Sequence, residues 1–580
     1  MIFCYVVVTA QGLRVSGARI VDHSGKEIIL RGMGLGGWML QEPYMMQLQG
    51  VTGTQLGIRN KITDLVGKEK TDIFYQSWLE NHCTKADIDS MASWGFNSVR
   101  LPIHYNLFTL PSDQEPVKGI DTWLEKGFAL TDSLLRWCED AGIYLILDLH
   151  AAPGGQGNDI AIADRDTTRP WLWGNEFNKK KTIELWKQLA KRYANEKWLG
   201  AYDILNEPNY GFSDPSDKNG CAEKSNAELK QLYLDITKAI RQVDKNHIII
   251  IEGNCWGNNY NGLLPFEDNN YVISFHKYWN HNDEGSIKKF IELREQYQVP
   301  IWCGETGENS NVWFADAIEL FEKNRIGWAM WPLKKIGINN PLEILPGARY
   351  YKLLDYWKGK GTRPSAIEAE EALMHYSRQA AISKNRVHRD VLDAMFRQPF
   401  ESAVIPFAKH RLKDSFLLFA VDYDLGRNGF AYQDKEWGNY WVSTSQRTDG
   451  NKGRMYRNDG ADITVCKDSI SNGYCVFNTE EGEWLQYTIN VPEKGIYGAL
   501  VRYASNDSSG SVFSLVINNK NGENWRVKSK PVKDSWKDAM SKSFEFNKGE
   551  NRIRLFVNKG NLSFNYIKFT RLKTKGLAHP

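Results

Sequence analysis

Between residues 12 and about 360, short apolar runs alternate with longer segments whose apolar residues recur at helical spacing. Three of the longer segments are residues 121–142, 178–196 and 226–244. The short runs are apolar on both faces, as a parallel sheet covered by helices requires. Eight such runs separated by helical patterns predict an α/β fold, a (β/α)8 TIM barrel. The runs are residues 30–37, 96–103, 143–150, 201–207, 247–253, 271–278, 301–305 and 326–332.

Beyond about residue 412 the pattern changes to short alternating strands punctuated by Gly, Asn, Asp and Ser. This spacing predicts a C-terminal antiparallel β-sandwich of the jelly-roll kind. The expected strands are residues 416–423, 483–491, 498–505, 512–518, 551–558 and 564–571. We therefore divide the chain into a barrel domain at 12–375, a helical linker region at 376–411 and a sandwich at 412–573.

Residues 1–11 resemble the latter part of a secretory signal, without the usual leading Lys or Arg. We interpret them as a possible truncated signal peptide, which predicts a secreted, extracellular or periplasmic protein; an ordinary first strand is the alternative. The 8 cysteines include no CxxC pair of a zinc site. Cys466 and Cys475 are close enough in sequence to be bridged.

Composition narrows the possible partners. A net charge of +3 without a Lys/Arg block gives no reason to expect a nucleic-acid partner. No apolar run is long enough to cross a bilayer. We also expect the protein to be a monomer. The 21 Trp, 26 Tyr and 25 Phe favour flat aromatic surfaces suited to sugar faces, although two aromatic-rich cores would also use them.

Most predicted barrel strands end on a polar or aromatic side chain. In a (β/α)8 barrel these carboxyl ends form the rim where chemistry is done, so we expect the residues to share one cleft. A single Glu or His there would more often be structural, but the whole set favours an active site. The set is Arg100, His150, Asn206, Glu207, Glu252, His276, Tyr278, Glu305 and Trp331.

Glu207 and Glu305 indicate which chemistry this rim performs. Hydrolysis of a glycosidic bond needs one carboxyl group to protonate the leaving oxygen and another to meet the anomeric carbon. The two groups stand about 5–5.5 Å apart in retaining enzymes and about 6.5–9.5 Å apart in inverting ones. Because each carboxylate raises the pKa of the other, one can stay protonated near neutral pH.

Neighbouring residues have predicted supporting roles. Arg100 can keep one glutamate ionised, and Asn206 can donate to a sugar hydroxyl near the reacting carbon. Tyr278 can hydrogen-bond the nucleophile, and Trp331 can form the floor beneath a sugar ring. A metal-dependent hydrolase is an alternative, because Asp148 and His150 lie two residues apart; no His-x-His follows the first strand, so we predict no metal.

Taken in order, the motifs "RLPI", "LHAAPGG", "NEP", "HKYW", "GETG" and "WP" resemble glycoside hydrolase family 5, over roughly residues 15–357. The resemblance implies Glu207 as acid/base and Glu305 as nucleophile, retention of configuration, and no metal or organic cofactor. It also implies substrate-binding roles for six residues: Arg100, His150, Asn206, His276, Tyr278 and Trp331. "RGMGLGGWMLQEPYM" is most similar to the branch of exo-β-1,3-glucanases and related β-glucanases.

The sandwich resembles carbohydrate-binding module family 6 in "AVDYDLGRNGFAYQD", "GEWLQYTINV", "VRYAS" and "NYIKF". The resemblance implies sugar contacts by Phe477, Trp536 and Asn565. Val421 stands where the family usually has a Glu that helps to hold calcium, which weighs against calcium at that place, and the sequence leaves open whether the module keeps a calcium ion. A separable module is expected: deletion after about Asp414 should leave cleavage of soluble oligosaccharides intact and weaken capture of insoluble polymer.

The sequence thus predicts an endo- or exo-acting β-glycosidase on a polysaccharide, most consistent with a β-1,3- or β-1,4-glucan. Activity on β-mannan or xylan, or transglycosylation, fits the same scaffold. A non-catalytic glycan-binding protein is the alternative from another class. That alternative predicts loss of a catalytic carboxylate, and both Glu207 and Glu305 are present.

Overall fold

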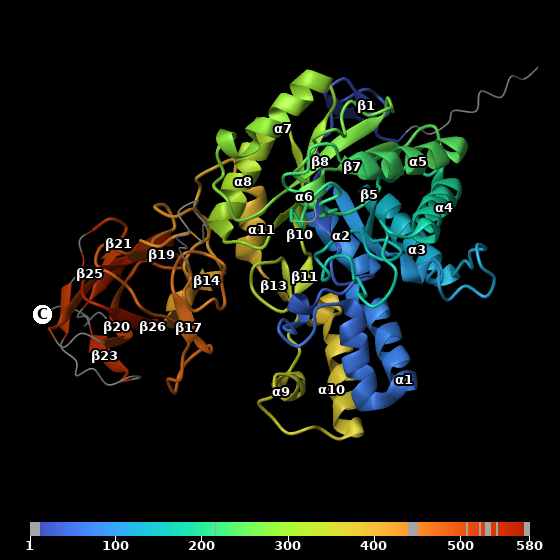
Figure 1. The fold of residues 1–580 in the computed structure, drawn as a ribbon. Helices are drawn as coiled ribbons and strands as arrows, with labels where there is room; N and C mark the ends of the chain where they lie inside the picture. The colour runs from blue at the N-terminus through green and yellow to red at the C-terminus, as the bar shows by residue number, and fades with distance from the viewer. Residues whose placement is uncertain are drawn as a thin grey trace, which may run out of the picture.

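The computed structural model describes residues 12–214, 216–438, 450–505, 509–520, 522, 524–527, 535–540 and 543–572. The possible signal peptide at 1–11 lies outside them. Figure 1 shows a barrel, a group of helices to one side of it, and a sandwich that approaches the barrel near α8 and α11. No helix in these ranges is long and apolar enough to cross a membrane.

Eight parallel strands close into a barrel in the order β10-β3-β4-β5-β6-β7-β8-β9, which confirms the predicted fold class. A small cluster of buried apolar side chains, which includes Ile146, Ile250 and Trp302, fills part of the barrel interior. A larger apolar core lies between the strands and the surrounding helices. The strands are β3 (Arg31–Gly34), β4 (Ser98–His104), β5 (Tyr144–Ala151), β6 (Leu199–Asp203), β7 (Ile248–Glu252), β8 (Tyr271–Lys277), β9 (Ile301–Gly307) and β10 (Gly327–Trp331).

The helices around the barrel follow from apolar residues at helical spacing. In the third helix, Phe128, Leu134, Leu135 and Cys138 are buried, and Gly142 ends the helix in the left-handed conformation (φ 69°). These helices are α1 (Gln55–His82), α2 (Lys85–Trp94), α3 (Glu125–Ala141), α4 (Glu176–Tyr193), α5 (Ala227–Val243), α6 (Asn254–Gly257), α7 (Glu284–Tyr297) and α8 (Asn311–Lys323). A hairpin, β1 (Arg14–Ser16) and β2 (Arg19–Val21), precedes them.

A second apolar core lies beside the barrel, where α10 (Ala366–Gln379) packs against both α1 and α9 (Ala348–Trp357). Trp78, Tyr350 and Tyr376 are buried within it. Further along, α11 (Arg389–Phe396) packs on α8. Much of the predicted linker at 376–411 therefore belongs to the barrel part instead of spanning a gap. Three short strands, β11 (Lys334–Lys335), β12 (Leu342–Glu343) and β13 (Arg386–Val387), form a small sheet.

The C-terminal part contains two largely antiparallel sheets packed around a common apolar core, as predicted. One sheet contains β14 (His410–Arg411), β16 (Tyr432–Gln433), β19 (Trp484–Val491), β21 (Ser511–Ile517), β22 (Asn524–Val527) and β25 (Gly549–Lys559). The other contains β15 (Ser415–Phe419), β17 (Ile463–Val465), β18 (Tyr474–Val476), β20 (Gly495–Ser505), β23 (Lys537–Met540), β24 (Phe544–Phe546) and β26 (Leu562–Arg571).

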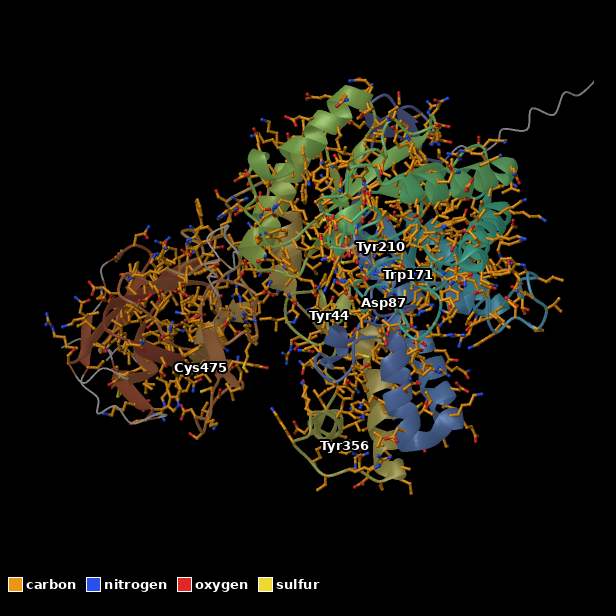
Figure 2. All side chains as sticks on the ribbon, in the orientation of Figure 1. Tyr44, Asp87, Trp171, Tyr210, Tyr356 and Cys475 are labelled. Atoms are coloured by element: carbon orange, nitrogen blue, oxygen red, sulfur yellow. A yellow bond between two sulfur atoms is a disulfide. The ribbon has the colours of Figure 1, made fainter. Side chains whose placement is uncertain are left out.

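A disulfide joins Cys221 to Cys255 and so ties the loop after β6 to α6, which follows β7. Cys466 and Cys475 are not bridged; their side chains form a hydrogen bond across the β17–β18 hairpin. Figure 2 shows Cys475 within the sandwich, far from Tyr44 in the barrel part.

Candidate active site

The glycine-rich segment after β3 makes room for an indole ring. A Cβ atom at Gly34 would lie 2.4 Å from the Trp331 ring, and one at Gly36 would lie 2.6 Å from it. Trp331 therefore rests directly against backbone, and its Nε1 donates to the Tyr44 hydroxyl at 3.0 Å. Its ring stacks on His150 with centroids 5.1 Å apart and planes 4° apart. The "GMGLGG" motif thus fixes an aromatic floor at the rim.

Arg100, fully buried at the middle of β4, is the electrostatic centre of the rim. Its Nε donates to Asp203 at 2.9 Å, and Nη2 donates to Asn206 at 2.8 Å and to Glu252 at 3.0 Å. Nη1 donates to Glu305 at 2.9 Å. Burial alone would lower the pKa of Arg100, but the surrounding carboxylates raise it well above its ordinary value. The guanidinium therefore stays charged and joins the ends of β6, β7 and β9.

Glu305 has both carboxylate oxygens engaged. Oε2 accepts from Arg100, and Oε1 accepts from the Tyr278 hydroxyl at 2.7 Å. Charge-assisted hydrogen bonds of this kind are short and directional. They fix the orientation of a side chain that is still 7% exposed.

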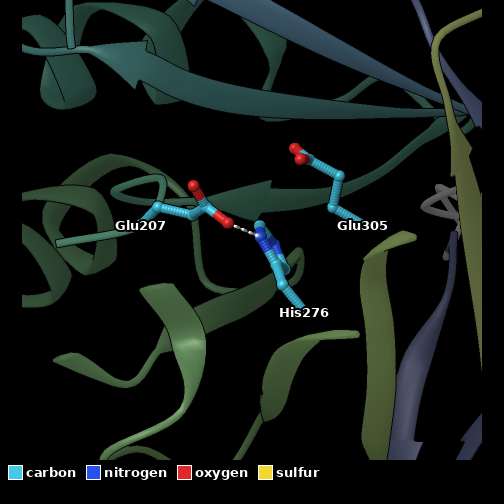
Figure 3. Close-up of side chains that lie close together, drawn as sticks. All are labelled: Glu207, His276 and Glu305. Carbon is cyan, nitrogen blue, oxygen red and sulfur yellow. Dashed lines mark hydrogen bonds and ion pairs between the residues drawn. The ribbon is translucent and has the colours of Figure 1, made fainter. Parts of the chain in front are cut away.

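Glu207 is held differently (Figure 3). Its Oε1 lies 2.6 Å from His276 Nδ1, and its backbone N–H donates to Glu252 at 2.7 Å. Its φ of 43° places it in the left-handed region, a strain typical of residues that their surroundings over-determine. Burial raises the pKa of Glu207 to about 7, with Glu305 adding to the rise and His276 opposing it. The carboxyl group can therefore carry a proton near neutral pH.

The two carboxyl groups meet in one place. One oxygen of Glu207, one of Glu305 and one ring nitrogen of His276 all lie within 4.8 Å of one another. This close approach is nearer to the separation of about 5–5.5 Å in retaining enzymes than to that of about 6.5–9.5 Å in inverting ones. The arrangement fits attack by one carboxylate on a sugar carbon while the other protonates the leaving oxygen.

His150 supports the site through its neighbours. Its Nδ1 lies 2.7 Å from Asp148, and its Nε2 lies 3.3 Å from the amide nitrogen of Asn206. Burial lowers the pKa of His150 to about 3, so the ring is neutral and can accept from Asn206. Asp148 and His150 therefore engage each other at the end of β5.

A cavity of about 770 Å³ opens above these residues, large enough for more than the reacting sugar. Several of its lining residues were not predicted from the sequence. Most of them lie in the loops that follow the strands, and Lys277 is the last residue of β8. Two of them could have been predicted, because "GWMLQEPYM" contains the acidic residue Glu42 and "GETGENS" contains Glu308 in addition to Glu305. The missed residues are Glu42, Tyr44, Asp159, Ile162, Trp256, Asn258, Lys277, Trp279, Asn280 and Glu308.

The predicted sugar-binding residues of the sandwich lie along one end of a sheet. Four residues of neighbouring strands are aligned across this end of the sheet: Val476, Phe564, Tyr503 and Lys537. Each predicted sugar-binding residue is the chain neighbour of one of them: Phe477, Asn565 and Trp536. Phe477 and Trp536 are half-buried, and Asn565 is fully buried.

The side chain of Asn565 is already occupied. Its Nδ2 donates to Asp468 at 2.9 Å and to the Ile470 carbonyl at 2.7 Å. Asp468 is itself paired with Arg502, at 2.8 Å. The segment after β17 thus covers Asn565, and the structure does not place this amide where a sugar could reach it.

The barrel, the rim and the pair of carboxyl groups together define a retaining glycosidase. Residues 58–336 match the family Cellulase (glycosyl hydrolase family 5), and residues 454–571 match Carbohydrate binding module (family 6). The barrel is therefore a glycosyl hydrolase family 5 domain, and the sandwich is a family 6 carbohydrate-binding module. The chain is a glycoside hydrolase, as the sequence predicted.

Three relatives show the range of named activities. The chain is 29% identical over 393 residues to "Beta-xylosidase" of Phanerodontia chrysosporium, covering 62% of this chain and 78% of that protein. It is 26% identical to "Endoglucanase C" of Acetivibrio thermocellus, covering 46% and 88% respectively. It is 28% identical to "Probable glucan 1,3-beta-glucosidase A" of Neosartorya fischeri, covering 50% and 67%.

Proposed function

We propose that the chain hydrolyses a β-glucan with retention of configuration, with Glu207 as acid/base and Glu305 as nucleophile. The observation that carries this assignment is the different environment of the two carboxyl groups within 4.8 Å. Arg100 and Tyr278 donate to Glu305, whereas Glu207 is buried against His276 with its pKa raised to about 7.

In the first step, the Glu305 carboxylate attacks the anomeric carbon, and Glu207 gives its proton to the leaving glycosidic oxygen. The bond formed is an ester between the sugar and Glu305, and the bond broken is the glycosidic C–O bond. In the second step, Glu207 removes a proton from water as that water attacks the anomeric carbon and releases Glu305. Arg100 and Tyr278 stabilise Glu305 when it leaves as a carboxylate.

Two relatives support a glucan as the substrate, because they are named as an endoglucanase and a probable glucan 1,3-beta-glucosidase. Trp256, Trp279 and Trp331 give the cavity aromatic surfaces suited to sugar faces. A β-xylosidic bond is the second candidate, since a relative matched over 393 residues is named "Beta-xylosidase". Mannan remains compatible with the scaffold.

Secretion is part of the proposal. Disulfides persist in oxidising compartments, and the Cys221–Cys255 bridge fits an extracellular or periplasmic location. Together with the signal-like residues 1–11, this bridge supports export of the protein.

A panel of substrates tests the proposal. Purified enzyme is incubated with β-1,3-, β-1,4- and β-1,6-glucans, xylan and mannan, and the products are followed by NMR as they form. We expect cleavage of a glucan with the β-anomer appearing first. Cleavage of xylan alone would favour the second candidate, and an initial α-anomer would contradict the retaining mechanism.

A further inference from the structure

The sandwich is joined to the barrel by a network of buried hydrogen bonds next to the active site. Asn458 of the sandwich donates from Nδ2 to the Asn309 carbonyl at 2.7 Å and to Asn311 Oδ1 at 3.1 Å. Its carbonyl accepts from the Asn311 backbone N–H at 3.0 Å. Asn311 Nδ2 in turn donates to Asp459 at 2.8 Å.

Asp390 of α11 completes the network. Its Oδ2 accepts from the Asn458 backbone N–H and from Asn311 Nδ2, both at 2.8 Å. The five residues of this network are at most 9% exposed. Breaking any one of these hydrogen bonds would therefore leave a buried polar group without a partner. We call this set (Asn309, Asn311, Asp390, Asn458 and Asp459) the interdomain clamp.

Buried contacts within the sandwich fix Asp459, one of its two residues in the interdomain clamp. Arg457 is fully buried, donates from Nε to Asp459 at 2.8 Å and lies 3.6 Å from the Tyr423 ring centroid. Its Nη2 donates to the Asp424 carbonyl at 3.1 Å. Asp459 is therefore anchored inside the sandwich before it meets Asn311.

On the barrel side, the clamp holds the segment that directly follows β9 and its Glu305. Glu308 lies one residue before Asn309, lines the catalytic cavity, and has a left-handed φ of 51°. Such a conformation at a non-glycine residue persists only where the surroundings impose it. Hydrogen bonds to Asn309 and Asn311 supply that constraint from the sandwich.

The first turn of α8 extends the effect to a second part of the cavity. Trp313 Nε1 donates to the Asn280 carbonyl at 2.9 Å, and Asn282 donates to the Trp313 carbonyl at 3.0 Å. This segment follows Tyr278, whose hydroxyl donates to Glu305. A displacement of the start of α8 would therefore move two segments that flank Glu305: the residues that follow it in the chain, and the segment that follows Tyr278.

We propose that the sandwich is a structural part of the catalytic site, and that Asn458 and Asp459 are positioning residues acting on sugar binding through the 308–313 segment. This rests on the proposed function of the pocket. It replaces the prediction that the sandwich can be removed without loss of cleavage of soluble oligosaccharides.

The test uses the full-length chain with Asn458→Ala, Asn311→Ala and the double variant, and Asn490→Ala on an exposed position of β19 as control. Kinetics are measured on the soluble oligosaccharide that the wild type cleaves. We expect each single variant to lower kcat/KM about tenfold, mainly through KM, and the double variant to be no worse than either single one, because the residues act through each other. The control should match the wild type.

Hydrogen exchange of residues 305–313 gives a readout that does not need turnover. We expect faster exchange there in Asn458→Ala, while binding of the variant to insoluble polysaccharide stays normal because the sandwich remains folded. If Asn458→Ala does not fold, Asp459→Asn, which keeps the shape of the side chain, takes its place.

Unchanged kinetics and exchange in the folded variants would overturn the proposal, as would fully additive losses. If the wild type cleaves no substrate, the proposed function fails, and the exchange experiment still decides whether the clamp holds the segment.

Discussion

The rim of the barrel and the end of the sandwich sheet were both predicted to bind sugar, but their residues differ in how they are positioned. Arg100, Glu207 and Glu305 converge because Arg100 lies within β4, Glu207 follows β6 and Glu305 lies within β9, all strands of one closed barrel. Asn565 also sits in a strand, yet a distant segment covers it through Asp468. In the barrel, strand position brings the rim residues together, whereas in the sandwich a connecting segment decides whether Asn565 is accessible.

The largest effect expected on the barrel side comes from Glu305→Gln. The amide keeps the size of the side chain but cannot form the glycosyl ester, so turnover should fall on the order of 10⁴-fold or more. Initial rates on the best substrate of the panel measure it. Glu292→Gln, an exposed Glu on α7, is the matched control and should keep wild-type rates. Comparable rates in both variants would remove Glu305 from its role.

Glu207→Ala should distinguish substrates by their leaving groups. Substrates with poor leaving groups need the proton and should lose about 10²–10⁴-fold in rate, while activated aryl glycosides should lose far less in the first step. Paired kinetics on both kinds of substrate check this. Equal losses on the two would mean that Glu207 is not the proton donor.

The pH dependence should report the same carboxyl group. Because burial raises the pKa of Glu207 to about 7, the acid is protonated below that pH and ionised above it. We expect kcat/KM to fall about tenfold per pH unit above about 7 for substrates with poor leaving groups. A profile that stays flat to pH 9 would contradict the assignment.

The smallest effects concern the sandwich. Trp536 is half-buried at the edge of the sheet end, so Trp536→Ala should weaken retention on insoluble polysaccharide several-fold. Asn565→Ala should lower thermal stability without a comparable change in retention, because its amide bonds only protein groups in the structure. Pull-down and thermal unfolding of both variants measure this. A stronger loss of retention in Asn565→Ala than in Trp536→Ala would show that Asn565 contacts the polysaccharide, which requires Asp468 to move away from it.

Much of the barrel could be predicted because a repeating pattern of apolar runs and helices leaves few topologies. The rim residues followed from the same pattern, since each ended a recognisable run. Glu42 and Glu308 were missed because their loops reach the cavity through contacts with distant segments, such as Tyr44 with Trp331. The Cys221–Cys255 bridge and the interdomain clamp join positions far apart in sequence, and no local pattern marks such pairings.

The central claim is that Glu305 forms a covalent bond with the sugar while Glu207 supplies the proton. Treatment with a 2-deoxy-2-fluoro glycoside bearing a good leaving group should trap that ester, because the fluorine slows its hydrolysis. Peptide mass spectrometry should then find one sugar on the peptide that contains Glu305. A label on another residue, or rapid turnover with inversion and no label, would contradict the account.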